Sequence, residues 1–338
     1  MTPQSLEKQT LFRQWLIACR SQELAHQPIS RTVLNHPLVL FRSGPTPVAL
    51  SDRCPHRNAP LSAGRVVQDC VECPFHGWQF NASGHCVSRP GVPLATPREV
   101  STESFSIREQ SGYMWVCLDP AVTSDPPVRP WDQDDGFERF FWVNTVQASF
   151  ADAIENLLDG THTPFVHSGL VRSSSQPQAF SAIVRIRDGL AEAEYIHEGQ
   201  QAGWISRLFE RDRASSFGRF IPPCIAELEY TSKRGTEFVL NTHFTPESPG
   251  ILRVYSTISL RKSRIPFFLK RWMISPFFRR VLQQDQQILR LQQANILRHG
   301  GPQFHSWEGD LLRGWIDYWL RTGELPEKDT EQRVEFLL

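Results

Sequence analysis

The chain has 338 residues, of which 40% are hydrophobic and 21% are charged, the composition of a folded protein long enough for two domains. Its 36 basic side chains balance 36 acidic ones, so the overall charge favours neither acidic partners nor nucleic acid, and we expect no nucleic-acid partner. The N-terminus lacks a signal-peptide pattern and no stretch approaches the ~20 apolar residues of a membrane span, so we expect a cytoplasmic protein with no integral membrane segment.

The first third of the chain, from about Leu11 to Leu118, consists of short apolar runs separated by turn residues. Residues 38–42 and 113–118 are two such runs, and residues 81–84, Asn-Ala-Ser-Gly, are one of the turns. Runs of this length between turn signals are typical of β-strands. The pattern predicts an all-β domain over residues 1–119, with its core at about 11–118.

A segment rich in proline and aspartate follows this domain. The stretch from Asp119 to Gly136 contains four prolines and five aspartates, a composition typical of an extended linker. We therefore expect a linker over residues 120–136 and a second domain over residues 137–338.

The second domain combines two kinds of apolar spacing. Residues 150–166 and 277–297 carry apolar side chains at helical spacing, whereas residues 179–260 alternate as strands do. Several alternating strands in succession favour an antiparallel sheet. The whole chain is therefore predicted to be α+β, with an all-β N-terminal domain.

Two short motifs in the first domain combine cysteine with histidine. They are Cys54-Pro-His56 and Cys73-Pro-Phe-His76, each in a predicted loop. The seven cysteines are an odd number, and in a reducing compartment such a pattern favours metal binding over disulfides. Two thiolates and two imidazoles are the ligand set of a [2Fe–2S] cluster in which histidines hold one of the irons. We predict that these four residues bind such a cluster.

A zinc knuckle is the alternative, because Cys70 and Cys73 are also spaced as Cys-x-x-Cys. A structural zinc site needs two ligand pairs that close a tetrahedron, and the pair Cys54 and His56 is too closely spaced for the usual zinc motif. The sequence therefore favours the iron–sulfur cluster.

A second constellation lies in the predicted helix of the second domain. It reads Asn156-x-x-Asp159-x-x-His162-x-x-x-x-His167. Two histidines and a carboxylate can hold Fe(II) with open positions where O₂ binds, so we predict that His162 and His167 are iron ligands. Asp159 is expected to share a helix face with His162 and to orient its imidazole. We expect Pro164 to break the helix between the two histidines.

The third iron ligand must be a carboxylate from elsewhere in the chain, and Asp285 is our prediction. It is a single acid among glutamines, close to the apolar stripe of a predicted helix, where an unpaired charge would be costly. Glu227, Glu229 and Glu237 are weaker substitutes, and a solvated role for Asp285 is the remaining alternative.

The motifs at residues 54–62 and 73–80, continued by the one at 155–167, closely resemble those of the Rieske non-haem iron oxygenases, and the resemblance spans most of the chain. It implies an N-terminal Rieske [2Fe–2S] domain and a C-terminal helix-grip (START/Bet v 1-like) domain. It also implies a head-to-tail homotrimer in which Asp159 joins His162 to His76 of the adjacent subunit. Asn156 would lie near the iron, and the stretch around Asp285 is similar to the family's C-terminal ligand helix.

The resemblance implies the terminal oxygenase of a multicomponent system. Its compact length is most similar to the homotrimeric monooxygenase branch, such as the vanillate and dicamba O-demethylases. It differs from the plant pheophorbide oxygenases, whose C-terminal membrane anchor and C-terminal Cys-x-x-Cys are not expected here. Without a dinucleotide fingerprint, the chain should receive NAD(P)H electrons through a flavin-dependent reductase, a ferredoxin, or both. We expect O₂-dependent hydroxylation or demethylation of a small aromatic or polycyclic substrate.

Other functions remain open at this point. Cis-dihydroxylation of an arene is the alternative within the same enzyme class. An electron-transfer protein is an alternative of another class, since a Rieske domain alone can carry electrons, although the motif at 155–167 argues against it. A zinc-stabilised binding protein is the third.

The segment from Arg261 to Arg280 contains seven basic residues and no acidic one, interleaved with aromatic and aliphatic side chains. It could bind an acidic electron donor or a membrane surface, or be an amphipathic helix with solvated arginines. Several further side chains could line a pocket but are better explained as structural residues. They are His197, His243, Trp204, Phe209, Phe217 and Phe244.

Overall fold

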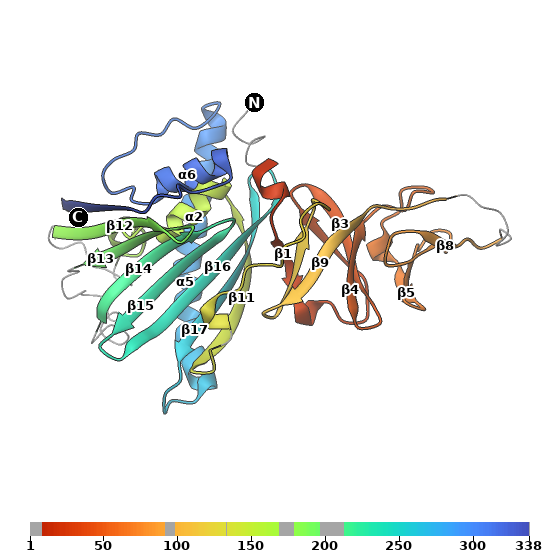
Figure 1. The fold of residues 1–338 in the computed structure, drawn as a ribbon, viewed down its shortest axis with the longest axis horizontal. Helices are drawn as coiled ribbons and strands as arrows, with labels where there is room; N and C mark the ends of the chain where they lie inside the picture. The colour runs from red at the N-terminus through yellow and green to blue at the C-terminus, as the bar shows by residue number, and fades with distance from the viewer. Residues whose placement is uncertain (1–8, 92–98, 133, 169–178, 197–212, 338) are drawn as a thin grey trace. The chain divides into compact units, whose positions relative to one another are not determined.

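The structure is a computed structural model that describes residues 9–91, 99–132, 134–168, 179–196 and 213–337. The chain divides into two compact units, drawn in Figure 1 and described separately below. One comprises Met1–Asp132 with Thr245–Pro249, and the other comprises Gln133–Phe244 with Gly250–Leu338. The division after Asp132 falls within the segment expected to be a linker. His197, Trp204 and Phe209 lie outside the described residues.

The first unit contains two antiparallel sheets, and the predicted all-β character is confirmed (Figure 1). The larger sheet has the order β1-β10-β9-β4-β3-β2 and the smaller sheet the order β5-β6-β7-β8. The larger sheet consists of β1 (Leu16–Arg20), β2 (Ile29–Val33), β3 (His36–Ser43), β4 (Thr46–Ser51), β9 (Ser104–Gln110) and β10 (Tyr113–Cys117). The smaller sheet consists of β5 (Arg65–Val67), β6 (Cys70–Glu72), β7 (Gln79–Phe80) and β8 (Cys86–Ser88). Three short 3-10 helices are η1 (Ser21–Glu23), η2 (Leu61–Ala63) and η3 (Pro130–Asp132).

An apolar core connects the larger sheet with the loops around the smaller one. It is made by buried side chains of β3, β4, β6 and β7 together with two cysteines, namely Val39, Phe41, Val48, Leu50, Cys54, Leu61, Val71, Cys73 and Phe80. Burial of these side chains stabilises the unit and fixes the ends of the loops that begin at Cys54 and Cys73.

The second unit is built on a sheet of eight strands in the order β11-β17-β16-β15-β14-β13-β12-β18. Its strands are β11 (Phe137–Gln147), β12 (Ala179–Arg187), β13 (Leu190–Ile196), β14 (Arg213–Ile221), β15 (Ile225–Ser232), β16 (Gly235–Ser248), β17 (Ile251–Arg261) and β18 (Thr330–Leu337). Strands β12 to β17 follow one another as neighbours in the sheet. The pairs from β12–β13 to β15–β16, and also β11–β17 and β12–β18, are antiparallel. The predicted antiparallel sheet is confirmed.

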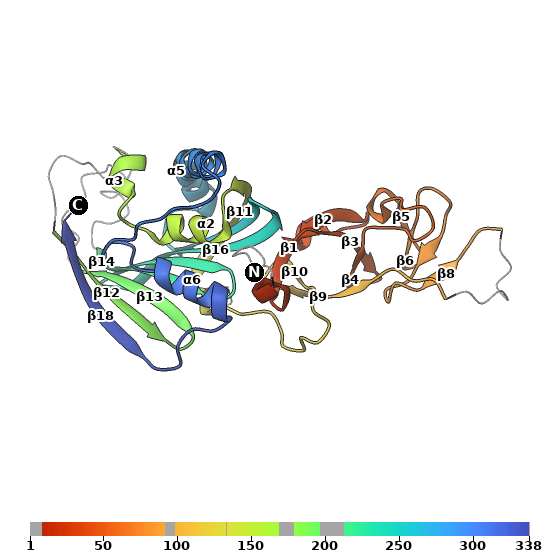
Figure 2. The same cartoon turned by 90° about the horizontal axis from the view of Figure 1, so that it is seen from above.

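Helices cover one face of this sheet, as Figure 2 shows for α2, α3 and α5. The helices are α2 (Phe150–Leu158), α3 (Thr163–Val166), α5 (Phe267–Arg298) and α6 (Arg313–Thr322). Leu157 of α2 and Ile274 of α5 pack with Leu240 and Ile258 of the sheet in one apolar cluster. This packing brings α2, α3 and the middle of α5 close together, and the α+β prediction is confirmed.

Two of the predicted helices have other bounds than expected. Residues 150–166 form two helices, and the first ends at Asp159, whose ψ of 113° is extended. The break therefore precedes His162, and the prediction that Pro164 breaks the helix between the histidines is wrong. Pro164 lies in the first turn of α3, where a missing N–H costs no hydrogen bond.

The long helix begins at Phe267 rather than at Phe277 and continues through Pro276. Among the described residues, the helices include none with the length and apolar character needed to span a membrane.

Candidate metal centres

The two cysteine–histidine loops of the first unit share one backbone hydrogen-bond pattern. In each loop the cysteine N–H donates to the carbonyl five residues on, and the N–H four residues on donates to the cysteine carbonyl. The loops begin at Cys54 and Cys73. The residue four positions after each cysteine is Asn58 in one loop and Gly77 in the other, and their φ angles are 62° and 68°. Asparagine and glycine adopt this left-handed conformation most easily, which explains their presence there.

The two thiols lie in the core of the unit and the two imidazoles lie nearer its surface. Cys54 and Cys73 are 1% and 3% exposed, and their thiols are within hydrogen-bonding reach of each other. The rings of His56 and His76 are 4.6 Å apart between centroids, and His56 stacks on Trp78 at the same distance. Paired sulfurs beside paired nitrogens fit a [2Fe–2S] cluster with thiolates on one iron and imidazoles on the other.

The arrangement does not fit one zinc ion. The ligand atoms of a tetrahedral Zn²⁺ lie within about 4 Å of one another. Among the described residues, the one group of three or more potential ligands within 4.8 Å lies in the second unit, so neither the four loop residues nor Cys70 with Cys73 forms such a site. Burial and the neighbouring Cys73 raise the pKa of the Cys54 thiol to about 11, and a bound metal would supply the positive charge that a thiolate needs there.

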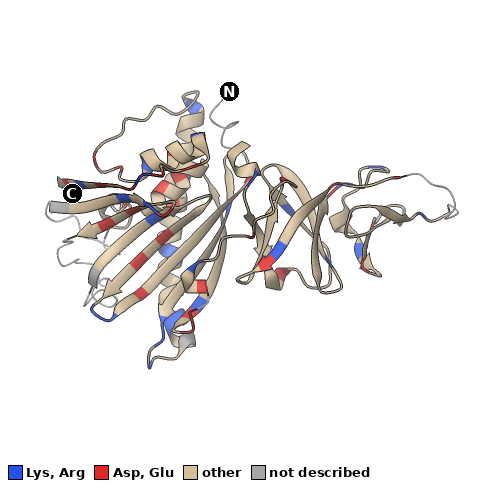
Figure 3. Cartoon of the chain, in the orientation of Figure 1, with Lys and Arg blue, Asp and Glu red and all other residues tan. Residues whose placement is uncertain are grey.

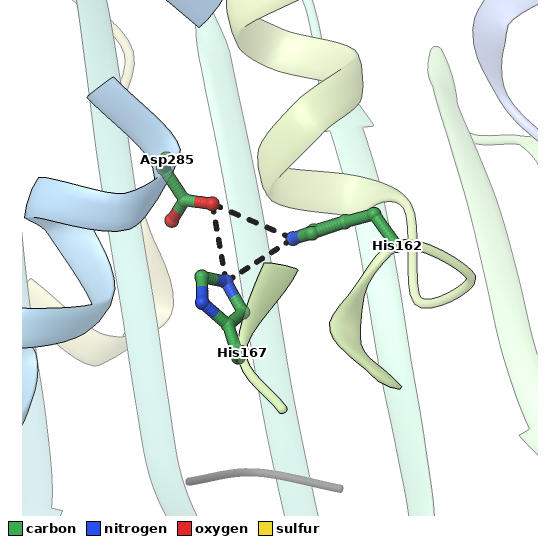
Figure 4. Close-up of side chains that lie close together, drawn as sticks. All are labelled: His162, His167 and Asp285. Atoms are coloured by element: carbon green, nitrogen blue, oxygen red, sulfur yellow. Dashed lines mark hydrogen bonds and ion pairs between the residues drawn. The ribbon is translucent and has the colours of Figure 1, made fainter. Parts of the chain in front are cut away.

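That group in the second unit consists of His162, His167 and Asp285, drawn in Figure 4. The Nε2 atoms of the two histidines are 3.2 Å apart, and Oδ1 of Asp285 lies 3.1 Å from Nε2 of His167 and 3.5 Å from Nε2 of His162. Ligands about 2.1 Å from a metal and at right angles are about 3 Å apart. The triangle therefore has the size of three ligands on one face of an iron ion.

The Nδ1 atom of each imidazole also has an oxygen neighbour, which determines on which ring nitrogen the proton lies. Nδ1 of His167 lies 3.1 Å from Oε1 of Gln284, and because an amide oxygen only accepts, the proton is on Nδ1 and the lone pair on Nε2. Nδ1 of His162 faces Oδ2 of Asp159 at 3.5 Å, which favours the same tautomer. Lone pairs of His162, His167 and Asp285 then converge on one point, and only a proton or a cation relieves their repulsion.

The pKa shifts of the site residues also indicate a bound cation. Burial lowers the pKa of His162, but Asp159 and Asp285 outweigh it and raise that pKa to about 9. Burial raises the pKa of Asp285, but the two histidines outweigh it and lower that pKa to about 2. Within the described residues, Oδ1 of Asp285 is buried yet accepts no hydrogen bond. The residues present therefore fit a bound metal cation.

Local contacts hold the loop between α2 and α3 in place. The N–H of Thr161 donates to Oδ1 of Asp159 at 2.6 Å, and the Thr163 hydroxyl donates to the Gly160 carbonyl at 2.9 Å. Tyr195 of β13 donates its hydroxyl proton to the Leu158 carbonyl at 3.1 Å. These bonds end α2 at Asp159 and turn the chain so that His162 begins α3 and His167 follows it.

Asp159 and His162 therefore face each other across a loop and do not share a helix face, so that part of the prediction is wrong although their side chains do meet. Asn156 lies on α2 and is not one of the three residues that converge. The substitute carboxylates are engaged elsewhere. Arg219 pairs with Glu227 at 3.1 Å and Glu229 at 2.6 Å, and the Ser232 hydroxyl donates to Glu237 at 2.9 Å.

Sequence reasoning missed three residues that position the site. The sequence predicts a helix around Gln284 and a strand around Tyr195, but it assigns neither side chain to the site. Arg313 of α6 is the third: it pairs with Asp152 at 2.8 Å and also with Glu155, and so ties α6 to the helix that carries Asp159. A local signal existed only for Gln284, because it is the neighbour of the predicted ligand Asp285.

Two stretches of the chain match known protein families. Residues 14–98 match the Rieske [2Fe-2S] domain and residues 146–312 match the Vanillate O-demethylase oxygenase C-terminal domain. The Dicamba O-demethylase oxygenase component of Stenotrophomonas maltophilia is 32% identical over 186 residues, which are 53% of this chain and 54% of that protein. Protein TIC 55, chloroplastic, of Arabidopsis thaliana is 27% identical over 291 residues, 81% of this chain and 52% of that protein. The chain thus spans about half the length of the curated relatives it matches.

Solved structures show the same fold. Dicamba monooxygenase bound to 3,6-dichlorosalicylic acid superposes with a TM-score of 0.80 at 21% identity, covering 92% of this chain and 97% of that one. NdmA of Pseudomonas putida CBB5 with caffeine gives 0.79 at 22% identity, covering 94% and 92%. The predicted cofactors, a [2Fe–2S] cluster and a mononuclear iron, agree with the two matched domains. Because a Rieske domain is followed by an oxygenase C-terminal domain on one chain, this protein belongs to the Rieske non-haem iron oxygenase family.

Proposed function

We propose that this chain is the terminal oxygenase component of a multicomponent monooxygenase. The observation that carries the proposal is the convergence of His162, His167 and Asp285, since two imidazoles and one carboxylate leave half the coordination sphere of an iron open. A protein that only carries electrons needs no such second site. Relatives named for demethylating dicamba and methylxanthine support a small aromatic or polycyclic substrate that is hydroxylated or demethylated.

In this proposal Cys54, Cys73, His56 and His76 hold the cluster, and the convergent triad holds the mononuclear iron. When bound, the cluster supplies one electron at a time and the Fe(II) centre activates O₂. In a monooxygenation one oxygen atom enters the product, while the other takes two electrons and two protons and leaves as water.

The chain's own residues hold the ligands and their protons. Gln284 accepts the Nδ1 proton of His167, and the Asp159 carboxylate faces Nδ1 of His162 at 3.5 Å and attracts its proton, so both Nε2 lone pairs stay available. His167 is only 2% exposed, so solvent reaches this ligand little. The bonds of Tyr195 and Thr161 fix the loop and keep Asp159 against His162.

Electrons must come from other proteins, because the sequence has no G-x-G-x-x-G fingerprint for a dinucleotide. We propose that a flavin-dependent reductase, directly or through a ferredoxin, delivers electrons from NAD(P)H to the cluster. All seven cysteines are free thiols, which suits a reducing compartment, so we propose the cytoplasm as the location.

We also propose the head-to-tail homotrimer that the family resemblance implies. In it Asp159 of one chain would accept a hydrogen bond from His76 of the next chain while it holds His162 of its own. Two features favour this: His76 is exposed at its loop, and Asp159 retains Oδ2, which faces only the His162 imidazole at 3.5 Å.

The test is anaerobic reconstitution with iron and sulfide, followed by turnover under ¹⁸O₂ with a reductase and a panel of methoxylated, aromatic and polycyclic compounds. We expect three irons per chain and a rhombic signal of the reduced cluster. We also expect one ¹⁸O atom per turnover in the organic products, in the hydroxylated substrate or, for a demethylation, in the formaldehyde that is released. Asp285→Ala should keep the cluster signal but lose the third iron and the product.

Other results would overturn the proposal. Two ¹⁸O atoms in the product would indicate a dihydroxylating dioxygenase. Two irons per chain with reversible reduction and no product would indicate an electron carrier, and stoichiometric zinc without a brown chromophore would indicate a zinc-stabilised binding protein.

A further inference from the structure

The first half of α5 and the turn before it expose a group of large apolar side chains, which we call the α5 patch. Its members are Ile265 at 47% exposure, Phe268 at 68%, Leu269 at 41%, Trp272 at 76% and Met273 at 42%. Exposed apolar patches rimmed by polar residues mark sites that bind a protein or a membrane.

Packing of the second unit does not explain the patch. On the same helix turn, Lys270 is only 6% exposed and its ammonium group pairs with Glu138 of β11. Burial of apolar area would place Trp272 inside and Lys270 outside, and the structure shows the reverse. The exposed side chains therefore contribute little to folding, which suggests a partner outside this unit.

The patch includes a groove of about 450 Å³ between two ridges of the helix. One ridge consists of Phe268, Trp272 and Pro276, and the other of Arg271, Ser275 and Arg279. Residues four apart lie one above another on a helix, so an apolar ridge runs beside a ridge with two guanidinium groups and one hydroxyl. An amphiphile with an anionic head and a hydrocarbon tail fits both ridges at once.

The helix segment that carries the groove, with the turn before it, is basic along the chain. Five exposed basic residues surround the patch, namely Lys262, Arg264, Arg271, Arg279 and Arg280. None of the five forms an ion pair within the described part of the chain, although Arg279 lies over the Trp142 ring at 5.8 Å. No acidic residue occurs from residue 261 to residue 284. The basic segment noted in the sequence is thus exposed, and blue segments mark it at the lower end of the second unit in Figure 3. The exposed acids Asp134 and Asp135 lie near its start, where the Lys262 N–H donates to the Gly136 carbonyl at 2.9 Å.

We propose that the α5 patch binds an anionic lipid bilayer surface, with the aromatic ridge among the acyl chains and the arginine ridge on the phosphates. A surface helix with Trp, Phe and Leu on one side and Arg on the other is the pattern of interfacial membrane binding. A partner surface that offered only acidic side chains would pair with the arginines but leave Trp272 and Phe268 exposed to water. The cluster loops of a second copy carry Arg53 and Arg57 and no acid over 53–57 and 73–78, so they do not complement the charge.

The test is flotation of the full-length, iron-loaded protein with vesicles of phosphatidylcholine alone or in equimolar mixture with phosphatidylglycerol. We expect binding only to the anionic vesicles, weakened by salt. Arg271→Gln and Arg279→Gln should each reduce partitioning about fivefold, and Phe268→Ser with Trp272→Ser at least about tenfold.

Matched controls come from the same unit. Arg290→Gln and Arg298→Gln remove exposed arginines from the other half of α5, and Trp307→Ser removes another exposed tryptophan. These variants should float as the wild type does, and the visible spectrum of the cluster should be unchanged in all variants. Trp272→Phe should still bind but should lose the part of the fluorescence that brominated lipids quench.

Several outcomes would overturn the proposal. Wild-type protein that stays unbound, or that binds neutral vesicles equally well, contradicts it. So does a loss of binding in the control variants as large as in the patch variants. If the patch variants instead lose binding to an acidic ferredoxin, or dissociate from an oligomer into monomers, the surface is a protein interface.

Discussion

His167 and Gln284 are 117 residues apart in the chain, yet Nδ1 of His167 lies 3.1 Å from Oε1 of Gln284. The next residue on α5, Asp285, places Oδ1 3.1 Å from Nε2 of the same ring. One turn of α5 therefore contacts both nitrogens of His167: it fixes the proton on one and presents a carboxylate beside the other. This pairing determines which lone pair is available to a metal.

The first prediction concerns that amide. Gln284→Leu removes the acceptor for the Nδ1 proton of His167, so the imidazole is free to change tautomer, and we expect iron affinity to fall about 10- to 100-fold. Gln284→Glu keeps an acceptor oxygen and should retain most of the iron. Iron retained after dialysis against graded chelator measures the effect. Equal retention in the wild type and the leucine variant would show that Gln284 does not position the ligand.

The sequence was sufficient for the parts of the molecule that depend on neighbours along the chain. The cluster motif is local: Cys54 and Cys73 each begin a loop that closes on itself within five residues, so spacing alone predicts it. The alternating strands likewise predicted the antiparallel sheet. His162, His167 and Asp285 do converge as expected, while their binding of iron stays a prediction.

The parts that sequence reasoning missed depend on contacts distant in the chain. The end of α2 at Asp159 is held by Tyr195 of β13, and no helical periodicity reports a hydroxyl from another element. The early start of α5 was missed because helical apolar spacing was recognised only from Phe277, whereas the helix continues through Pro276 and Ile274 packs in the apolar cluster of the sheet. Propensity is overridden wherever packing supplies more free energy than one lost hydrogen bond costs.

The second prediction is a pH dependence of the metal-free protein. The pKa of His162 is raised to about 9, so the stability it contributes is fully present below its ordinary value of 6.5 and is lost as the pH rises through 9. The pKa of Asp285 is lowered to about 2, so its contribution is present above 3.8 and is lost as the pH falls through 2. In urea unfolding, the stability contributed by these two groups should be constant from about 4 to 6.5 and should decline towards 9.

His162→Gln removes the group whose titration causes the alkaline decline. In this variant the metal-free protein should show a flat profile from 6.5 to 9. A decline of unchanged size in His162→Gln would assign it to another group.

The third prediction concerns Arg313, which pairs with two carboxylates of α2. Arg313 is half-buried, pairs with Asp152 and Glu155, and also pairs with Asp317 at 2.9 Å. Burial raises the pKa of Glu155 despite the attraction of Arg313, so this carboxylate depends on its partner. Arg313→Met leaves the buried Asp152 and the half-buried Glu155 without a cation, and we expect the free energy of unfolding to fall by about 3 kcal/mol.

Arg333 provides the matched control for that substitution, because it pairs with Glu335 at 3.1 Å on the surface of the same unit. Arg333→Met should change the free energy of unfolding by less than about 1 kcal/mol. Both values follow from urea unfolding monitored by tryptophan fluorescence. Similar small losses in the two variants would mean that the Arg313 pairs are solvated and do not hold α2.

The fourth prediction concerns Asp159, whose oxygens have separate partners. Oδ1 accepts from the Thr161 N–H at 2.6 Å, and Oδ2 faces Nδ1 of His162 at 3.5 Å. These partners outweigh the effect of burial and lower the pKa of Asp159, so it is a carboxylate at neutral pH. Asp159→Asn keeps one oxygen that accepts from the Thr161 N–H but replaces Oδ2, which faces His162, with an NH₂ group that only donates.

We expect Asp159→Asn to retain both metals and the fold, because Asp159 is not one of the three convergent residues, but to lose at least about 100-fold in turnover. Reduction of the cluster by dithionite should stay normal, whereas oxidation of the reduced cluster by substrate and O₂ in a single turnover should be slow. Thr161→Ala, which leaves the N–H donor intact, is the matched control and should turn over normally. Wild-type turnover in Asp159→Asn with both metals bound would mean that electrons reach the iron without this carboxylate.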